Sequence, residues 1–366
     1  MLFPVLNRVI LWYYEPIWFV FQNIKGYQVE LNATRLYAGN SMKTIQFREA
    51  ICEAMSEEMR RDESIYLLGE EVAEYNGAYK ASKGMLDEFG AKRVIDTPIA
   101  ELGFAGIAIG SAMNGNRPIV EYMTFNFSLV GIDQIINNAA KIRQMSGGQL
   151  NCPIVFRGPT ASAGQLAATH SQAFESWFAN CPGLKVIVPS NPADAKGLLK
   201  SAIRDDDPVI FMESEQMYGD KGEVPEGEYL IPIGVADKKR EGTDVTIVSF
   251  GKIIKEAYTA AEKLAEEGIE CEIIDLRTVR PMDQKAILDS VKKTNRLVIL
   301  EEAWPFGNVA TEITYLVQNE AFDYLDAPIQ KINTADTPAP YSQVLLKEWL
   351  PNSEDVIKAV KKVMYR

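Results

Sequence analysis

The stretch VIDTPIAELGFAGIAIGSAMNG (residues 94–115) decides the fold, because it joins a short apolar strand to a helix through a proline-containing turn. Residues 92–98 are predicted to form a strand that ends at Pro98, which has no N–H to donate to a ladder. Residues 101–113 are predicted to form a helix of mostly Gly, Ala and Ile that begins with one carboxylate, Glu101. A strand followed at once by a helix is the repeating unit of a parallel α/β sheet.

The same alternation continues along the chain from Met42. Strands are expected at residues 64–72, 92–98, 119–125, 152–158, 184–190, 208–214, 244–251, 269–278, 296–303 and 329–334. Helices are expected at residues 42–62, 101–113, 129–146, 192–204 with Asn191 as its N-cap, 253–267, 308–321, from residue 354, and after RPMD (280–283). Apolar strands that alternate with helices imply parallel sheets covered on both faces. A segment rich in Gly, Pro and Glu (218–232) interrupts the pattern, so we predict an α/β protein with two open, mostly parallel sheet domains, at 42–226 and 227–366.

Composition excludes several classes of function. The 366 residues suit two domains, and a formal net charge of −12 argues against nucleic acid and anionic membrane as partners. Four cysteines without a CxxC spacing fit reduced thiols in a cytosol-like compartment, and a single histidine excludes a His-rich metal site within the chain. The chain has no GxGxxG, GxxxxGK[ST], GxSxG or HExxH motif, so a conventional dinucleotide or nucleoside-triphosphate site is not expected.

Residues 1–41 differ from the rest. They are rich in aromatic residues, but prolines and charged residues interrupt them before any run of about 18 apolar residues, so a membrane-spanning helix is not expected. A signal peptide is also a poor match, because aromatic residues and an acid stand where a plain apolar core should be. We expect a start-site artefact or a disordered leader, with a membrane-associated extension as the minority alternative.

Glu101 is the first candidate site residue. An acid in the first turn of a helix is favoured by the helix dipole by about 0.3–1 kcal/mol, and capping alone could explain it. However, the Gly- and Ala-rich helix that follows lets another backbone or a flat ligand approach closely. A carboxylate at such a contact would be desolvated and would need a specific partner. Ligands of parallel α/β sheets also bind beyond the carboxyl ends of the strands, which is where Glu101 stands.

Two further features have both a functional and an ordinary explanation. His170, in a loop of small residues after strand 152–158, is the natural acid, base or anion stabiliser, or else an ordinary hydrogen-bonded loop histidine. Asp205, Asp206 and Asp207 stand at a helix C-terminus, where they oppose the helix dipole. They form either a solvated turn or part of a cation site with nearby carbonyl oxygens.

Several long motifs together carry a resemblance to one family. They are LLGEEVAEYNGAYKASKGM, DTPIAELGFAGIAIGSAMNGNRPIVEYMTFNF, PIVFRGPTASAG, THSQAFESWFANCPGLKVIVPSNPADAKGLLKSAIRDDDP and LRTVRPMD. From about Lys43 to the C-terminus, the chain resembles the beta subunits of thiamin-diphosphate-dependent 2-oxoacid dehydrogenases, most closely those of pyruvate dehydrogenase. The resemblance implies a transketolase-like pyrimidine-binding domain at 42–226 and a transketolase C-terminal-like domain at 227–366, the latter for assembly and for docking on the acyltransferase core. Residues 1–41 lie outside the resemblance.

The resemblance also implies roles for individual residues. Glu101 would hydrogen-bond the pyrimidine nitrogen of thiamin diphosphate and exchange a proton with it. Glu70, Ile99, Met123 and Phe127 would line the pyrimidine pocket, although Met123 and Phe127 are core residues by pattern alone. His170 would lie near the substrate and the acyl-accepting lipoyl group. A structural potassium ion would be held by Ile154, Ala202, Ile203, Asp205 and Asp207.

The chain lacks the Gly-Asp-Gly motif with which thiamin enzymes hold magnesium and the diphosphate, since its only Gly-Asp pair, Gly219-Asp220, is followed by Lys221. The resemblance therefore implies an α2β2 heterotetramer in which an alpha subunit holds magnesium and completes the cofactor site. The expected activity is oxidative decarboxylation of pyruvate with acetyl transfer to lipoyl groups of the acyltransferase core, in the bacterial cytoplasm or, as a second choice, an organellar matrix. Branched-chain 2-oxoacid and acetoin dehydrogenase beta subunits remain alternatives, as does a non-catalytic assembly subunit.

Overall fold

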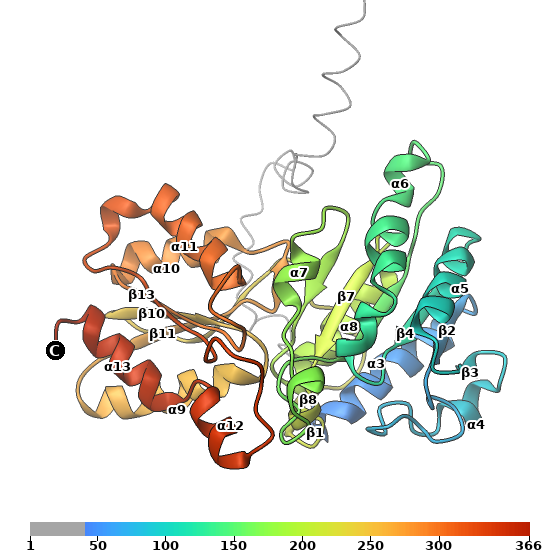
Figure 1. Ribbon diagram of the computed structural model, residues 1–366, viewed down its shortest axis with the longest axis horizontal. Helices are drawn as coiled ribbons and strands as arrows, with labels where there is room; N and C mark the ends of the chain where they lie inside the picture. The colour runs from blue at the N-terminus through green and yellow to red at the C-terminus, as the bar shows by residue number, and fades with distance from the viewer. Residues whose placement is uncertain (1–40) are drawn as a thin grey trace, which may run out of the picture. The chain divides into compact units, whose positions relative to one another are not determined.

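A computed structural model describes residues 41–366 of the chain, so the expectations for residues 1–41 lie almost wholly outside the described part. The described residues form two large sheets and one two-stranded sheet, with helices around them (Figure 1). Most strand pairs in the two large sheets are parallel, as the alternation of strands and helices predicts. Within this part of the chain, no helix is both long enough and apolar enough to cross a membrane.

The first sheet has seven strands. In spatial order they are β12 (Thr278–Arg280), β6 (Lys185–Ile187), β7 (Val209–Glu213), β5 (Val155–Pro159), β4 (Arg117–Glu121), β2 (Ile65–Gly69) and β3 (Val94–Asp96). The helices of this part of the chain are α3 (Phe47–Arg61), α4 (Met85–Phe89), α5 (Glu101–Met113), α6 (Ile142–Met145), α7 (Glu175–Ala179) and α8 (Pro192–Arg204). Helix α5 begins and ends where the sequence predicts, and Asn191 caps α8 by accepting the N–H of Asp194 at 2.9 Å.

The second sheet has five strands. In spatial order they are β14 (Gln330–Ile332), β13 (Leu297–Leu300), β10 (Val245–Ser249), β11 (Cys271–Asp275) and β9 (Asp237–Arg240). Its helices are α9 (Ile254–Glu266), α10 (Gln284–Thr294), α11 (Val309–Glu320), α12 (Gln343–Trp349) and α13 (Ser353–Val363). The antiparallel edge strand β9 and the short helix α12 were not predicted, because neither has a long apolar run.

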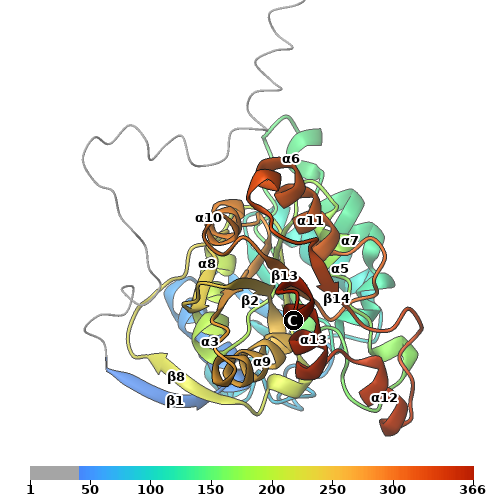
Figure 2. The same cartoon turned by 90° about the vertical axis from the view of Figure 1, so that its left-hand side faces the viewer.

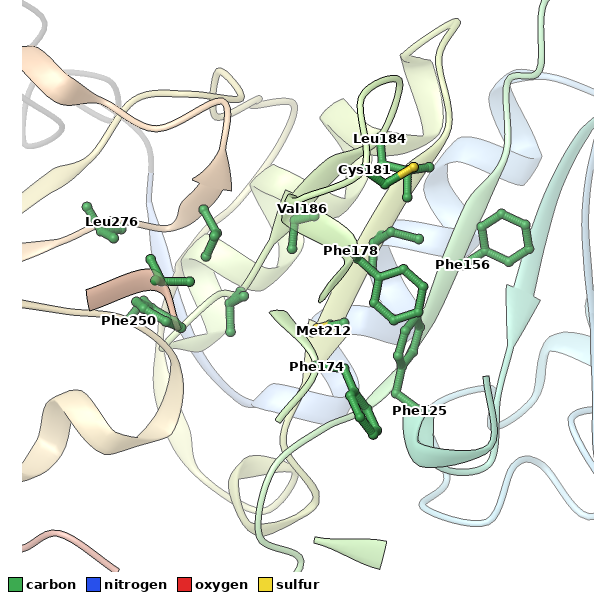
Figure 3. Packing of buried hydrophobic residues seen from close by; sticks show 14 of the residues in the cluster. Phe125, Phe156, Phe174, Phe178, Cys181, Leu184, Val186, Met212, Phe250 and Leu276 are labelled. Carbon is green, nitrogen blue, oxygen red and sulfur yellow. The ribbon is translucent and has the colours of Figure 1, made fainter. Parts of the chain in front are cut away.

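The two large sheets share structure. Strand β12 lies in the chain between β11 and α10 of the second sheet, yet it pairs antiparallel with β6 at the edge of the first. One buried apolar cluster also joins the two sheets: Figure 3 shows Phe250 and Leu276, which follow β10 and β11, together with Val186 of β6 and Met212 of β7. The second sheet therefore supports the first directly, and not only through the connecting chain.

The expected helix at 42–62 begins later than predicted. Residues Met42–Gln46 form strand β1, which pairs antiparallel with β8 (Lys221–Pro225), as Figure 2 shows at the edge of the molecule. Helix α3 starts only at Phe47, where the Gln46 N–H donates to Glu49 Oε2 at 2.7 Å. Because β1 commits its backbone groups to β8, these residues cannot join the helix. The segment 218–232, expected to be a linker only, therefore contributes a strand.

Two expectations around β4 are also wrong in detail. The strand predicted at 119–125 ends at Glu121, and a 3₁₀ helix at Phe125–Leu129 follows. The regular helix predicted from residue 129 is instead a π-helix at Gln134–Ala139 followed by the short α6, and the N–H of Ala140 donates five residues back to the Ile135 carbonyl at 3.0 Å. Ile135 and Ala139 are nevertheless buried. Four residues make almost one turn of a π-helix, so both side chains still lie on the same, inner face.

Candidate functional site

The candidate residues gather at the carboxyl ends of three neighbouring strands. Glu70 directly follows β2, Glu101 opens the helix after β3, and Met123 lies just past the end of β4. The order β4–β2–β3 places these carboxyl ends side by side, at the end of the sheet where ligands of parallel α/β proteins bind. Gly69 makes the close approach possible, since a Cβ there would lie 2.4 Å from the Glu121 carbonyl oxygen.

Glu70 and Glu101 form a buried carboxyl pair. Their exposed fractions are 5% and 6%, and their side chains lie close enough for the charge of Glu101 to act on Glu70. Burial and the neighbouring charge of Glu101 raise the pKa of Glu70 to about 7, and the Met123 N–H that Glu70 accepts opposes this shift. Two carboxyl groups in contact share a proton readily, because both cannot be charged at low cost.

The pair has unused hydrogen-bonding capacity. Among residues 41–366, Glu70 Oε1 and the Tyr122 hydroxyl are buried without a hydrogen-bond partner. Burial raises the pKa of the Tyr122 phenol, and the charges of both acids add to this shift, which places the phenol near them. Gly131 closes in from the next segment, where a Cβ would lie 2.9 Å from the Glu101 carbonyl oxygen and 3.2 Å from the Tyr122 hydroxyl. Buried polar atoms in native proteins normally have partners, so this group is a candidate ligand site.

The remaining predicted pocket residues lie in different environments. Met123 and Phe127 are half-buried in the loop and 3₁₀ helix that follow β4. Ile99 is 79% exposed, so the described chain leaves it at the surface beside Glu101. Leu102 and Ile107 on α5, and Val130 in the segment after the 3₁₀ helix, are exposed apolar residues as well. The site is thus buried at the two acids and open beside them.

His170 lies next to the pocket. It ends a 3₁₀ turn at Ala168–His170, its Nδ1 is 3.0 Å from Thr169 Oγ1, and its ring meets that of Phe127 edge-on at 5.0 Å between centroids. The structure therefore brings His170 and Phe127 together, although 43 positions separate them in the sequence. The loop that carries His170 is held by Asn126, whose Oδ1 accepts the Gln172 N–H at 3.0 Å.

A fully buried ion cluster lies beneath the site, and the sequence analysis missed it. Arg157 of β5 donates to both oxygens of Glu213 on β7, at 2.6 Å each, and also to Glu121 at the end of β4. The hydroxyl of Tyr218 donates to Glu213 at 2.7 Å. Burial raises the pKa of Glu121 against the opposing charge of Arg157. A charged residue inside each of three apolar strands was the available signal, since buried charges are expected to pair.

The residues predicted to hold potassium lie around the C-terminus of α8 and the starts of β5 and β7. They are Ile154, Ala202, Ile203, Asp205 and Asp207. Arg117 donates to the carbonyl oxygens of Ile203 at 3.2 Å and Asp205 at 2.9 Å. Lys185 contacts both carboxylate oxygens of Asp205, at 2.7 and 2.6 Å. The opposition between the acids and the helix dipole is thus relieved by three side-chain cations, Arg117, Lys185 and Arg143.

Metal ligation by side chains has no further candidate in this part of the chain. Within residues 41–366, no three His, Cys, Asp or Glu side chains are grouped so that they could hold a metal ion. The carbonyl oxygens of Ile203 and Asp205 each keep a second lone pair beside the guanidinium of Arg117. A monovalent cation there would share these oxygens with Arg117.

Two family models match the chain. The model described as "Transketolase, pyrimidine binding domain" matches residues 43–221, and the model described as "Transketolase, C-terminal domain" matches residues 234–356. Together they cover the two large sheets, including the edge where Glu70 and Glu101 lie.

Curated relatives are similar over most of the chain. The "Pyruvate dehydrogenase E1 component subunit beta" of Rhizobium meliloti is 56% identical over 90% of this chain and 72% of that protein. The mitochondrial proteins of the same name from Dictyostelium discoideum and Rattus norvegicus are 50% and 52% identical, over 91% and 87% of this chain and 94% and 90% of theirs. A solved structure, "Split gene transketolase, inactive beta4 tetramer", matches with a TM-score of 0.71 over 88% of this chain and 98% of that one. At 22% identity, this last likeness concerns the fold alone.

Proposed function

This chain belongs to the family of pyruvate dehydrogenase E1 component beta subunits. From that premise we propose that it supplies one side of an active site for the oxidative decarboxylation of pyruvate. In this proposal it acts with an alpha subunit as a thiamin-diphosphate-dependent 2-oxoacid dehydrogenase that transfers an acetyl group to lipoyl groups. The buried pair of Glu70 and Glu101 carries the proposal, because it offers a shared proton and unpartnered polar atoms at the edge where ligands of such sheets bind.

The residues at this edge fit the pyrimidine ring of thiamin diphosphate. Glu70 Oε1 and the Tyr122 hydroxyl lack partners among residues 41–366, and Met123 and Phe127 provide apolar surface for a flat ring. When bound, the cofactor supplies a nucleophilic carbon and an electron sink. Glu101 would hold the ring nitrogen through a hydrogen bond and exchange a proton at that atom. Glu70, whose pKa is about 7, would keep a proton in the pair and so limit the charge that is buried.

His170 would act on the side of the substrate. Its ring is half-buried and meets the Phe127 ring edge-on, and its Nδ1 lies near the Thr169 hydroxyl. A neutral imidazole has one ring nitrogen that donates and one that accepts, so it can give or accept a proton. We assign it to the acyl-transfer end of the pocket, near the lipoyl group.

The alpha subunit would cover exposed apolar side chains on and around α5, those of Ile99, Leu102, Ile107 and Val130. Apolar patches of this kind on a soluble domain mark interaction sites. Because this chain lacks a Gly-Asp-Gly motif, the alpha subunit would hold magnesium and the diphosphate, in an α2β2 heterotetramer. Residues 42–226 would form the pyrimidine-binding domain, and residues 227–366 would serve assembly and docking on the lipoyl acyltransferase core.

Two finer proposals concern ions and location. A potassium ion would bind the carbonyl oxygens that Arg117 also contacts. The residues around it would be Ile154, Ala202, Ile203, Asp205 and Asp207. The relatives with the highest identity include bacterial proteins, which supports a bacterial cytoplasm as the location.

The test is a reconstitution. The chain is mixed with its cognate alpha subunit, and dye reduction is measured with pyruvate, 3-methyl-2-oxobutanoate and acetoin. We expect pyruvate to be used at least about tenfold more efficiently than the others, and no turnover and no saturable thiamin diphosphate binding by the chain alone. Preference for 3-methyl-2-oxobutanoate or acetoin would reassign the substrate, and inactivity of the complex with all three would support a non-catalytic subunit.

A further inference from the structure

The second sheet has a topological switch point, with a crevice at the carboxyl ends of β10 and β13. Strand β10 has β11 on one side and β13 on the other, so the connections after β10 and β13 leave in opposite directions. In open α/β sheets, ligands bind at such a switch point, outside the carboxyl ends of the strands. Lys252 lies in the 3₁₀ turn that follows β10, and Glu302 lies two residues past the end of β13. Their side chains are 10% and 5% exposed and form an ion pair at 3.1 Å.

This crevice receives a segment of the first domain. The Ser162 N–H donates to Glu302 Oε1 at 2.8 Å, and Lys252 Nζ donates to the Ser162 carbonyl oxygen at 2.5 Å. Both backbone polar groups of Ser162, a completely buried residue, are therefore satisfied by side chains of the second domain. Ser162 belongs to the segment from Thr160 to Gln172, which connects β5 to α7 and carries His170.

The segment has a backbone that needs external support. Ala161 and Ala167 have φ angles of 60° and 63°, in the left-handed region that residues with a Cβ rarely adopt. Such conformations persist where the surroundings over-determine them, and they gather at functional sites. The contacts to Ser162 follow directly after Ala161 and so fix the first of these two residues.

A small cavity lies where the segment meets the crevice. It has a volume of about 20 Å³, enough for one water molecule, and Lys252, Glu302, Ser214 and Glu175 are among its lining residues. Within the described part of the chain, Ser214 Oγ and Glu302 Oε2 are buried without partners, so one water could bridge them. Burial and the nearby charges of Glu301 and Glu302 raise the pKa of Glu175 to about 8, so Glu175 is mostly uncharged at neutral pH. Glu175 therefore does not compete with Glu302 for the charge of Lys252.

The path from Ser162 to the imidazole is short. The Ala161 N–H donates to the Gln172 carbonyl oxygen at 2.9 Å, which closes the segment into a loop, and the Gln172 N–H is held by Asn126 at 3.0 Å. His170 is two residues before Gln172, and its ring depends on the loop for its place against Phe127. Because the Ala161–Gln172 hydrogen bond closes this loop, a shift of Ser162 also shifts the part of the loop that carries His170.

We propose that Lys252 and Glu302 are positioning residues for His170, and that the switch-point crevice of the second domain serves as the receptor for this loop rather than as a ligand site of its own. This inference rests on the proposed function only in the role given to His170. It predicts that a charge far from the pyrimidine pocket controls acyl transfer without controlling cofactor binding.

The test uses the complex with the alpha subunit and a lipoyl domain as acceptor. K252M should lower the rate of lipoyl reductive acetylation by about ten- to a hundredfold and leave thiamin diphosphate affinity within about twofold of wild type. Hydrogen exchange of residues 161–172 should become faster. K252R, which can donate to the same oxygens, should recover most of the rate. The matched control is K255M, three residues along on α9, whose side chain is half exposed and pairs with Asp220; it should change neither measurement.

A double-mutant cycle separates positioning from general damage. If Lys252 acts through His170, K252M should cause no further loss of rate in an H170A background, whereas losses that multiply would overturn the proposal. Should K252M not assemble, E302Q, which removes the charge yet keeps an acceptor for the Ser162 N–H, is subjected to the same exchange measurement. Unchanged exchange at 161–172 would also refute the inference. A wild-type complex that uses no 2-oxoacid would instead refute the proposed function, and hydrogen exchange would still decide the positioning role.

Discussion

In the described part of the chain, the carboxyl ends of the two large sheets each carry a buried acid with an unpartnered oxygen, Glu70 in the first sheet and Glu302 in the second, but only Glu302 is paired with a cation. At the first sheet, Glu70 and Glu101 face each other, and burial together with the charge of Glu101 raises the pKa of Glu70 to about 7. At the second sheet, Glu302 lies 3.1 Å from Lys252 and accepts the Ser162 N–H. Glu70 and Glu302 each have one carboxylate oxygen without a partner among residues 41–366, so the difference lies in charge and not in the number of hydrogen bonds.

This difference indicates which of the two sheets binds a ligand at the carboxyl ends of its strands. Burying an acid beside a cation forms a stable structural contact, and removing one partner of such a pair typically costs about 3–5 kcal/mol. Burying two acids together costs stability unless a proton or an incoming group relieves the repulsion. At the first sheet, Glu70 and Glu101 therefore remain able to bind a ligand. At the second sheet, Glu302 already binds Lys252 and the loop that contains Ser162.

The largest expected effect is that of E101Q on turnover. Glutamine keeps the size and a hydrogen bond, but it cannot exchange a proton with a ring nitrogen, so kcat of the assembled enzyme should fall by about 10²–10⁴-fold. The melting temperature and assembly with the alpha subunit should stay near those of wild type. Steady-state kinetics with pyruvate and size-exclusion chromatography measure both.

The matched control is E301Q at the second sheet. Glu301 is also fully buried, its pKa is also raised to about 7 by burial, and it accepts the N–H groups of Val309 and Ala310 at the start of α11. E301Q should leave kcat within about threefold of wild type, because this acid faces a helix N-terminus and not the proposed pocket. Near-normal turnover of E101Q, or equal losses in both variants, would remove the contrast between the two sheets.

The next expected effect is a change in how stability depends on pH. The pKa of Glu70 is about 7 in the folded chain and near 4.5 when unperturbed, so between these values the folded state holds the proton that the unfolded state has released. Stability from this group therefore falls as pH rises from about 4.5 to 7, by at most about 3 kcal/mol. E70Q cannot titrate, so its stability relative to wild type should increase over this range.

Urea denaturation of the full chain at several pH values measures this change. E71Q, at the exposed neighbouring position, should run parallel to wild type. Parallel curves for wild type and E70Q would mean that Glu70 ionises normally, and the two carboxyl groups would then not share a proton.

The part of the site that is local in sequence could be predicted, and the part that depends on distant residues could not. Glu101 was singled out because a strand, a proline turn and a helix of small residues adjoin it, and α5 has the predicted bounds of residues 101–113. Asn191 was likewise found as the N-cap of α8. These features depend on backbone propensities within a few residues, which a sequence displays directly.

Contacts across the sheets leave no local signal. Glu302 and Ser162 are 140 positions apart, and Arg157 and Glu213 are 56 apart. Strand β12 pairs with the sheet of the other domain, which no alternation of strands and helices indicates. The shift of residues 42–46 from helix to strand has the same cause, because β1 exists only through pairing with β8.

The smallest expected effect concerns the amino-terminal edge of the first sheet, where acids are matched by cations. Asp205 is bound by Lys185, and Asp207 by Arg143 and Lys185, so a potassium ion would add to a neutralised cluster. Replacing sodium by potassium at equal ionic strength should raise the melting temperature by only about 1–2 °C, because weak binding contributes about 1 kcal/mol. No difference between the ions would contradict the site. A rise above about 5 °C would contradict the pairing, since acids neutralised by Lys185 and Arg143 cannot draw that much from a further cation.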